Sequence, residues 1–246
     1  MNAVTEMTEA PPFLTARWLH LLMLNYEVAP ALLRAHVPAG TELDCFEGRC
    51  LVSMVGFQFL ETRVRGLAVP FHRDFEEVNL RLYVRREAGG ELRRGVVFVK
   101  EIVPRRAIAW VANALYNEKY VALPMEHEDG IDGDGGHVQY RWKHRGHWAR
   151  LGALVEGKAQ LPAPGSEAEF ISEHYFGYTA QRDGSTLEYR VEHPQWAVWK
   201  AREPVFECDV ASLYGADLVE PLATAPSSCF VAEGSEVVVR RGAPLL

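Results

Sequence analysis

The sequence of 246 residues lacks a hydrophobic run that could cross a membrane. The longest apolar stretch near the start, Trp18 to Leu24, includes His20 and is far shorter than the roughly 20 residues that a spanning helix needs. Residues 1–12 contain no basic residue and no apolar segment of the kind found in a secretory signal. These absences predict a cytoplasmic protein with no membrane partner.

A surplus of positive charge is also missing. Lysine and arginine number 26 against 33 acids, so the formal net charge is −7, which disfavours a general nucleic-acid surface. The basic cluster alternates with aromatic residues and is expected to be the solvated face of a strand; it comprises Arg141, Lys143, His144, Arg145, His147 and Arg150. We therefore expect no nucleic-acid partner.

Motifs that bind metals and nucleotides are absent as well. The four cysteines have no C-x2-C spacing: Cys45 and Cys50 flank a turn, and Cys208 and Cys229 lie far away, which predicts free, buried thiols in a reducing compartment. The acidic, glycine-rich stretch 126–136 lacks calcium-loop spacing and is expected to be an exposed hairpin loop. Without a phosphate-binding loop or a G-x-S-x-G motif, the sequence indicates no metal and no cofactor.

Short segments with alternating apolar and polar residues make up most of the chain. They recur at the regular spacing of a barrel or sandwich, which predicts a mainly β, β-rich α+β fold. A hairpin is expected from Leu43 to Phe59, a loop over residues 61–73 and a strand over residues 170–180. Helical patterns are few, and the longest one begins at Pro104 and places its apolar residues on one face, at Ile108, Val111, Ala112, Leu115 and Tyr116.

The segment 75–84 is predicted to be a strand whose two faces differ. One face is apolar, whereas the other carries Glu77, Asn79 and Arg81 at alternate positions. Glu77 and Arg81 would lie about 13 Å apart along the strand, too far to neutralise each other directly. The pattern alone leaves two interpretations open, a face wetted by solvent or the wall of a ligand cavity.

Lys119 is the candidate nucleophile, because a lysine with a depressed pKa can attack a ketone and form a Schiff base. It follows the predicted helix and precedes an apolar segment at residues 121–123. The alternative is a helix-terminal lysine that faces solvent, and the neighbouring Glu118 favours it by raising the pKa of the amine. His174 and His193 fit either pocket groups or structural hydrogen-bond donors.

Several segments in combination resemble a known family, the YqjF-like proteins of bacteria, which have no known function and are similar in turn to acetoacetate decarboxylases. The resemblance runs from about Arg17 to Arg240. It rests on Trp18-Leu19-His20-Leu21-Leu22, the segment Pro38 to Asp44, Phe75-x-Glu77-x-Asn79-x-Arg81-x-Tyr83-Val84, the segment Tyr116 to Met125, Tyr175-Phe176-Gly177-Tyr178 and His193-Pro194-x-Trp196.

We expect a flexible tail over residues 1–12, and the resemblance implies a single domain, here residues 13–246. The domain would be a closed, cone-shaped antiparallel barrel with a few outer helices and an internal pocket. By the same resemblance, Glu77 matches a pocket glutamate of the decarboxylases. Glu118 and Lys119 match their pair of adjacent lysines, with Glu118 at the position that forms the Schiff base.

On this basis we expect an enzyme-like pocket for a small oxo- or carboxy-compound, with Glu77, Arg81 and Lys119 as candidate catalytic residues. The candidate ligand-binding residues are Asn79, Tyr83, Tyr116, Glu118 and Tyr175. The alternative is a non-catalytic binding or sensor protein on the same barrel. The sequence leaves a homo-oligomer open.

Overall fold

The computed structural model describes residues 11–68, 70–109, 113, 117 and 119–245. The strands are β1 (Pro12–Glu27), β2 (Glu42–Leu43), β3 (Leu51–Val64), β4 (Leu67–Ala68), β5 (Phe75–Ala88), β6 (Glu91–Val103), β7 (Tyr120–Ala122), β8 (Met125–Asp129), β9 (Gly135–His144), β10 (His147–Gln160), β11 (Phe176–Ala180), β12 (Thr186–Glu192), β13 (Val198–Glu207), β14 (Ser228–Arg240) and β15 (Ala243–Pro244). The short helices are α2 (Pro30–Leu33), η1 (Arg34–His36), α4 (Glu167–Ser172), α5 (Val210–Tyr214), η2 (Ala216–Leu218) and α6 (Val219–Leu222).

The strands form one sheet that closes on itself. Its order is β15-β12-β11-β6-β5-β3-β1-β14-β13-β10-β9-β8, and a further pairing of β12 with β14 joins β12, β11, β6, β5, β3, β1 and β14 into a ring. The pairings within the ring are antiparallel apart from the parallel pairing of β11 with β6. The expected mainly β, closed architecture is therefore confirmed, although the sheet is mixed and not wholly antiparallel, and a few short helices accompany it.

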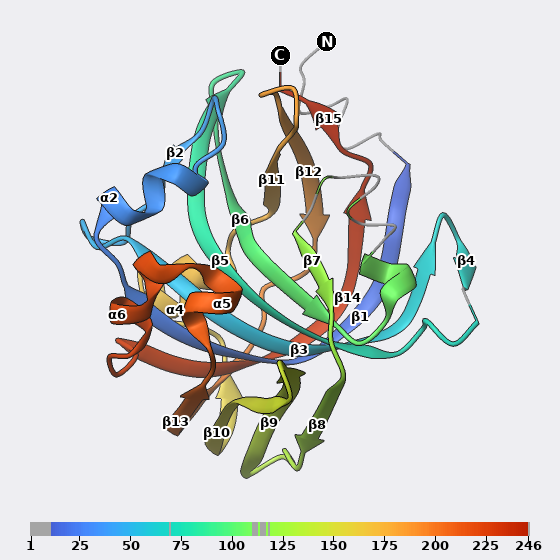
Figure 1. The fold of residues 1–246 in the computed structure, drawn as a ribbon, viewed down its shortest axis with the longest axis vertical. Helices are drawn as coiled ribbons and strands as arrows, with labels where there is room; N and C mark the ends of the chain where they lie inside the picture. The colour runs from blue at the N-terminus through green and yellow to red at the C-terminus, as the bar shows by residue number, and fades with distance from the viewer. Residues whose placement is uncertain (1–10, 69, 110–112, 114–116, 118, 246) are drawn as a thin grey trace.

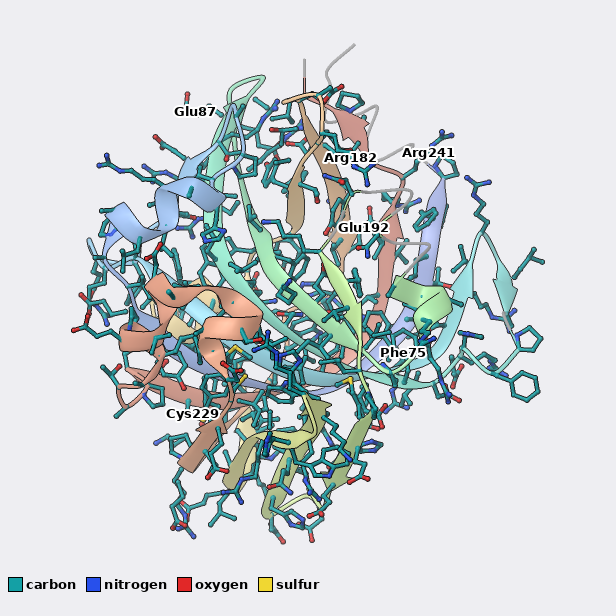
Figure 2. All side chains as sticks on the ribbon, in the orientation of Figure 1. Phe75, Glu87, Arg182, Glu192, Cys229 and Arg241 are labelled. Atoms are coloured by element: carbon teal, nitrogen blue, oxygen red, sulfur yellow. A yellow bond between two sulfur atoms is a disulfide. The ribbon has the colours of Figure 1, made fainter. Side chains whose placement is uncertain are left out.

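Strands β13, β10, β9 and β8 continue the sheet beyond the ring and lie together at one end of the molecule (Figure 1). This branch packs on the outer face of the ring, where Tyr140 of β9 and Leu151 of β10 join the core formed by β1, β3 and β5. Figure 2 shows Glu87, Arg182 and Arg241, which are exposed, at the opposite end. The ring thus has one apolar core outside it and a second inside it.

Strand β5 is buried on both faces because it separates these two cores. Its apolar positions Val78, Leu80, Leu82 and Val84 belong to the outer core, as the alternation predicts. Phe75 and Tyr83 belong to the inner core. The polar side chains between them therefore point into the ring, which excludes the interpretation of a face wetted by solvent.

The helix expected from Pro104 is described only over a helical turn at residues 106–109, and Val111, Ala112, Leu115 and Tyr116 fall outside the described residues. Elsewhere the segment from Pro30 to His36 is helical, and Asp209 caps α5, which ends before Gly215. The strand expected over residues 170–180 is wrong in its first half, because Phe170 lies in α4. Ser166 begins α4 by accepting a hydrogen bond from the backbone N–H of Glu169, three residues later; this S-x-x-E spacing is a helix-start signal.

Three connections also differ from expectation. Residues 61–64 continue β3 and turn into β4 instead of forming a loop, and Met125–Asp129 forms β8 instead of part of an exposed loop. The first arm of the expected hairpin, β2, pairs with β5. Strands β4 and β8 pair with strands that are near in sequence, β3 and β9, whereas β2 pairs with a strand about 40 residues further along the chain.

The expectation of free thiols is wrong for Cys45 and Cys50, which form a disulfide. Phe46 and Arg49 pair across the turn and bring the two Cα atoms to 4.3 Å, within reach of a disulfide. Cys208 and Cys229 are free and partly buried. Within the described part of the chain, the helices are all too short or too polar to cross a membrane.

Gly56 tests the contact between the ring and the outer branch. A Cβ atom there would lie 2.5 Å from Cδ2 of the buried Tyr140, so Gly56→Ala should lower the free energy of unfolding by about 2 to 3 kcal/mol. At Gly133 a Cβ atom would meet open space, so Gly133→Ala should change the free energy of unfolding by less than about 0.5 kcal/mol. Urea unfolding measures both; equal stability of the two variants would contradict this packing.

Candidate functional site

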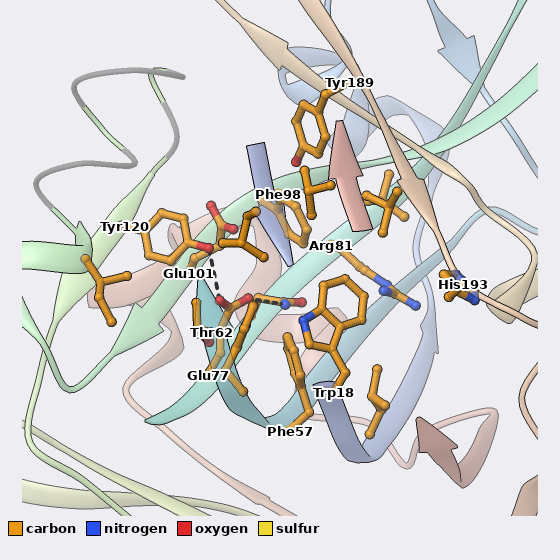
Figure 3. Close-up of a pocket in the computed structure, with 18 of the residues that line it drawn as sticks. Trp18, Phe57, Thr62, Glu77, Arg81, Phe98, Glu101, Tyr120, Tyr189 and His193 are labelled. Carbon is orange, nitrogen blue, oxygen red and sulfur yellow. Dashed lines mark hydrogen bonds between the residues drawn. The ribbon is translucent and has the colours of Figure 1, made fainter. Parts of the chain in front are cut away.

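A cavity of about 240 Å³ lies inside the ring (Figure 3). Residues of β1, β3, β5, β6, β7, β11, β12, β14 and α4 line it, with Ala107 and Ile108 of a helical turn at residues 106–109. Aromatic side chains make up much of the wall; they include Trp18, Phe57, Phe59, Phe75, Phe98, Phe176 and Trp196. Such a mainly apolar space with few polar groups is typical of small-molecule sites.

Glu77, Asn79 and Arg81 all lie in the wall of this cavity. They are 2%, 2% and 9% exposed, although each is polar or charged. Their common direction follows from alternation along β5, because residues two apart on a strand point to the same side. The structure therefore places this predicted group of residues together.

The carboxylate of Glu77 is held by two donors. The hydroxyl of Tyr120 donates to Oε2 at 3.0 Å, and Nδ2 of Asn79 donates to Oε1 at 2.9 Å, as the dashed lines of Figure 3 show. Tyr120 comes from β7, which pairs in parallel with β6. The two hydrogen bonds fix the orientation of the carboxylate toward the cavity.

Glu101 is a wall residue that the sequence analysis missed. It lies opposite Asn79 in the pairing of β5 with β6 and is 2% exposed. Figure 3 shows Glu77, Glu101 and Tyr120 on the same side of the cavity. The sequence does carry a signal for Glu101, because this acid lies inside the mainly apolar segment 96–103. Glutamate is rarely buried in a strand unless it has a hydrogen-bonding or functional role.

Arg81 lies on the other side of the cavity, toward His193 (Figure 3). Its Nη2 atom lies 3.6 Å from Sδ of Met23 and 3.4 Å from the carbonyl oxygen of Ile171. The guanidinium carbon lies 5.6 Å from the centroid of the Tyr83 ring. Among the described residues, no carboxylate forms an ion pair with Arg81, and its Nε has no hydrogen-bond partner. A buried cation in this state is costly unless an anion joins it.

Other polar atoms of the wall also lack a hydrogen-bond partner within the described part of the protein. They are Nε1 of Trp18, Oγ1 of Thr62, Oδ1 of Asn79 and Nδ1 of His174. Buried polar atoms are nearly always paired, so atoms of this kind around one cavity indicate where a polar ligand would bind.

Two histidines of the wall are neutral at pH 7. Burial lowers the pKa of His193 to about 4, and the charge of Arg81 adds to the effect. The His193 ring stacks on Trp196 at 3.9 Å. Burial likewise lowers the pKa of His174, although a hydrogen bond to Asp44 opposes this shift. The imidazole rings of His174 and His193 therefore add no positive charge near Arg81.

The remaining candidate residues lie elsewhere. Tyr83 belongs to the inner core beside Arg81, and the hydroxyl of Tyr175 donates to Glu173 at 2.6 Å while its ring contacts His193. Neither is part of the cavity wall. Tyr116 and Glu118 fall outside the described residues.

Lys119 is exposed and does not belong to the described cavity wall. Its backbone carbonyl accepts a hydrogen bond from the backbone N–H of Glu101 at 3.3 Å. The backbone of Lys119 is therefore next to a wall residue, although Lys119 itself is not part of the described wall. The geometry gives no support to a Schiff base at this residue. In the residues that the structure describes, no three His, Cys, Asp or Glu side chains gather to hold a metal ion.

The neutral state of His193 has a measurable consequence. Because its folded-state pKa is about 4 and its ordinary value is 6.5, the unfolded chain binds the extra proton between these values, and stability falls as the pH falls through that window. His193→Phe should reduce the loss of stability between pH 7 and pH 4.5 by about 1 to 2 kcal/mol, allowing for partial exposure. Urea unfolding across this range measures it.

His127 is the control, with the opposite sign. A hydrogen bond to Glu76 raises its pKa, so its contribution is present below pH 6.5 and is lost as the pH rises through the folded-state value. His127→Phe should therefore cost more stability at pH 6 than at pH 8. An unchanged pH dependence in His193→Phe would contradict the assignment.

Comparison with known proteins finds similarity along most of the chain. The uncharacterized protein YqjF of Bacillus subtilis is 27% identical over 205 residues, which cover 82% of each chain. The enduracididine biosynthesis enzyme MppR complexed with pyruvate matches with a TM-score of 0.65 at 15% identity, covering 96% of this chain and 91% of MppR. Acetoacetate decarboxylase from Legionella pneumophila matches with a TM-score of 0.63 at 12% identity, covering 96% and 88%. The two structures show a shared fold.

The resemblance inferred from the sequence is thus confirmed for family and fold. The profile of the DUF2071 family matches residues 15–236, which include the strands of the ring from most of β1 to most of β14. The chain belongs to the DUF2071 family of uncharacterized conserved proteins.

Proposed function

We propose that this protein binds a small oxo- or carboxy-compound in the ring cavity and acts on it chemically. In this proposal Arg81 holds a carboxylate or other anionic oxygen, and Glu77 acts as acid, base or orienting group. The observation that carries it is the buried Arg81 guanidinium, which has no ion-pair partner among the described residues. A ligand carboxylate would supply charge-assisted hydrogen bonds at this position.

The size of the cavity supports a ligand with few carbon atoms. Its volume of about 240 Å³ is below the range of about 300 to 1,000 Å³ that drug-sized ligands occupy. A ligand held by Arg81 would extend along β5 toward Glu77, four residues earlier on the same strand face. The similar fold of MppR has been solved with pyruvate bound, a compound of this class.

Glu77 supports the enzymatic part of the proposal. Its carboxylate is buried, is oriented by Tyr120 and Asn79, and belongs to the cavity wall. A positioned carboxylate next to a carbonyl compound can transfer a proton to or from it. Asn79 would serve as the positioning residue, since it contacts Glu77 and also lines the cavity.

The alternative is a carrier or sensor that binds the same ligand without changing it. One observation favours it: the described residues of the wall include no lysine and no cysteine that could form a covalent intermediate. Proton transfer by Glu77 needs neither, so the two functions differ only in whether the ligand is consumed.

Arg81→Met tests the anion site. Thermal unfolding with a series of small carboxylates, including pyruvate and acetoacetate, should show stabilisation of the wild type and none of this variant. Without ligand, Arg81→Met should be at least as stable as the wild type, because the change removes a buried cation without an ion-pair partner.

Arg93→Met is the matched control, because Arg93 is buried outside the cavity wall and pairs with Glu188. Loss of that pair should cost about 3 to 5 kcal/mol of stability while the response to carboxylates remains. The anion site would be refuted by an Arg81→Met protein that carboxylates stabilise as strongly as the wild type.

Glu77→Gln separates the enzyme from the carrier. After incubation with any compound that stabilises the protein, mass spectrometry should show product with the wild type. The Glu77→Gln protein should bind the compound with turnover reduced by about 10² to 10⁴-fold, the usual contribution of an acid–base group. Recovery of the compound intact from the wild type would establish the carrier instead.

A further inference from the structure

His174 reaches the cavity wall from the link between α4 and β11, and it pairs with Asp44, which follows β2. Nε2 of His174 lies 3.2 Å from Oδ2 of Asp44, and the two side chains are 1% and 0% exposed. The same carboxylate accepts hydrogen bonds from Nε of Arg94 at 2.7 Å and from Nη2 at 3.3 Å. Asp44 is thus held in place, and it orients His174 in turn.

The protonation states of Asp44 and His174 determine which nitrogen of His174 carries the hydrogen. Burial by itself raises the pKa of Asp44, but the hydrogen bonds from His174 and Arg94 outweigh it and leave the pKa below its ordinary value. Asp44 is therefore ionised and can only accept, so the hydrogen of His174 must be on Nε2. Because burial keeps this imidazole neutral, Nδ1 carries a lone pair and is an acceptor.

Nδ1 of His174 is buried and has no hydrogen-bond partner in the described part of the chain. The ring is fixed by Tyr83 at 4.7 Å and by Phe170 at 4.9 Å between centroids. His174 itself belongs to the cavity wall. The protein therefore offers the cavity a rigid, neutral acceptor that only a donor group can satisfy.

This acceptor lies at the same end of the cavity as Arg81. The Tyr83 ring contacts both side chains, with the guanidinium carbon of Arg81 at 5.6 Å from its centroid. Arg81 also donates to the carbonyl oxygen of Ile171, three residues before His174. A small ligand whose carboxylate binds Arg81 would therefore place its adjacent carbon atoms near His174.

We propose that Nδ1 of His174, oriented by Asp44, accepts a hydrogen bond from a hydroxyl group of the ligand whose carboxylate Arg81 holds. This inference rests on the proposed function and narrows its ligand to a small hydroxycarboxylate. A hydroxyl fits better than an ammonium group, because the neighbouring guanidinium repels a second cation and His174 is neutral. A carboxylate without a donor would leave Nδ1 buried and unpaired, so it should bind more weakly than the matching hydroxy acid.

Matched pairs of acids test the inference. Isothermal titration of the wild type should show about tenfold tighter binding of lactate than of propionate, and of 3-hydroxybutyrate than of butyrate. His174→Phe should abolish this preference by weakening only the hydroxy acids, whereas Arg81→Met should abolish binding of all four. His127→Phe, which changes a histidine outside the cavity wall, should keep the preference.

Nitrogen-15 NMR of the wild-type imidazoles gives a second readout that does not depend on a variant. Nδ1 of His174 should resonate as an unprotonated nitrogen, and lactate should shift this signal while propionate leaves it in place. A protonated Nδ1, equal affinity for lactate and propionate, or a preference that survives in His174→Phe would each overturn the inference and leave the Arg81 site intact. If none of the acids binds the wild type, both this inference and the proposed function fail.

Discussion

The burial of β5 on both faces is the constraint on which the site depends. The outer branch of strands covers the apolar face of β5, and the closed ring encloses the opposite face. The polar side chains of that second face are therefore kept from bulk water. Burying the Arg81 cation costs several kcal/mol, so the packing of the whole sheet must offset that cost. The result is a cavity whose buried cation has no ion-pair partner among the residues that the structure describes.

The interior of the ring is divided by charge. Glu77 and Glu101 lie with Tyr120 on one side, and Arg81 lies on the other with neutral histidines around it. The two histidines stay neutral because burial disfavours their charged forms. This division gives a small ligand a defined direction, since its anionic end and its reacting carbon would meet different groups.

The shared fold leaves the chemistry undecided. MppR and acetoacetate decarboxylase have the same architecture at 15% and 12% identity, and one fold commonly carries several activities. Lys119 is exposed and lies outside the described cavity wall, so the structure gives no support to a reaction through an amine at that residue. The chemistry proposed for this protein therefore rests on the groups that line the cavity, above all the carboxylate of Glu77.

The sequence by itself determined the mainly β fold, the central strand at residues 75–84 and the common face of Glu77, Asn79 and Arg81, because alternation along a strand is local. It could not show whether that face met solvent, since the answer depends on ring closure between β12 and β14. The role of Glu101 in the wall and the pairing of His174 with Asp44 were decided by tertiary structure for the same reason. These residues are distant in sequence, and only the folded sheet brings them to one cavity.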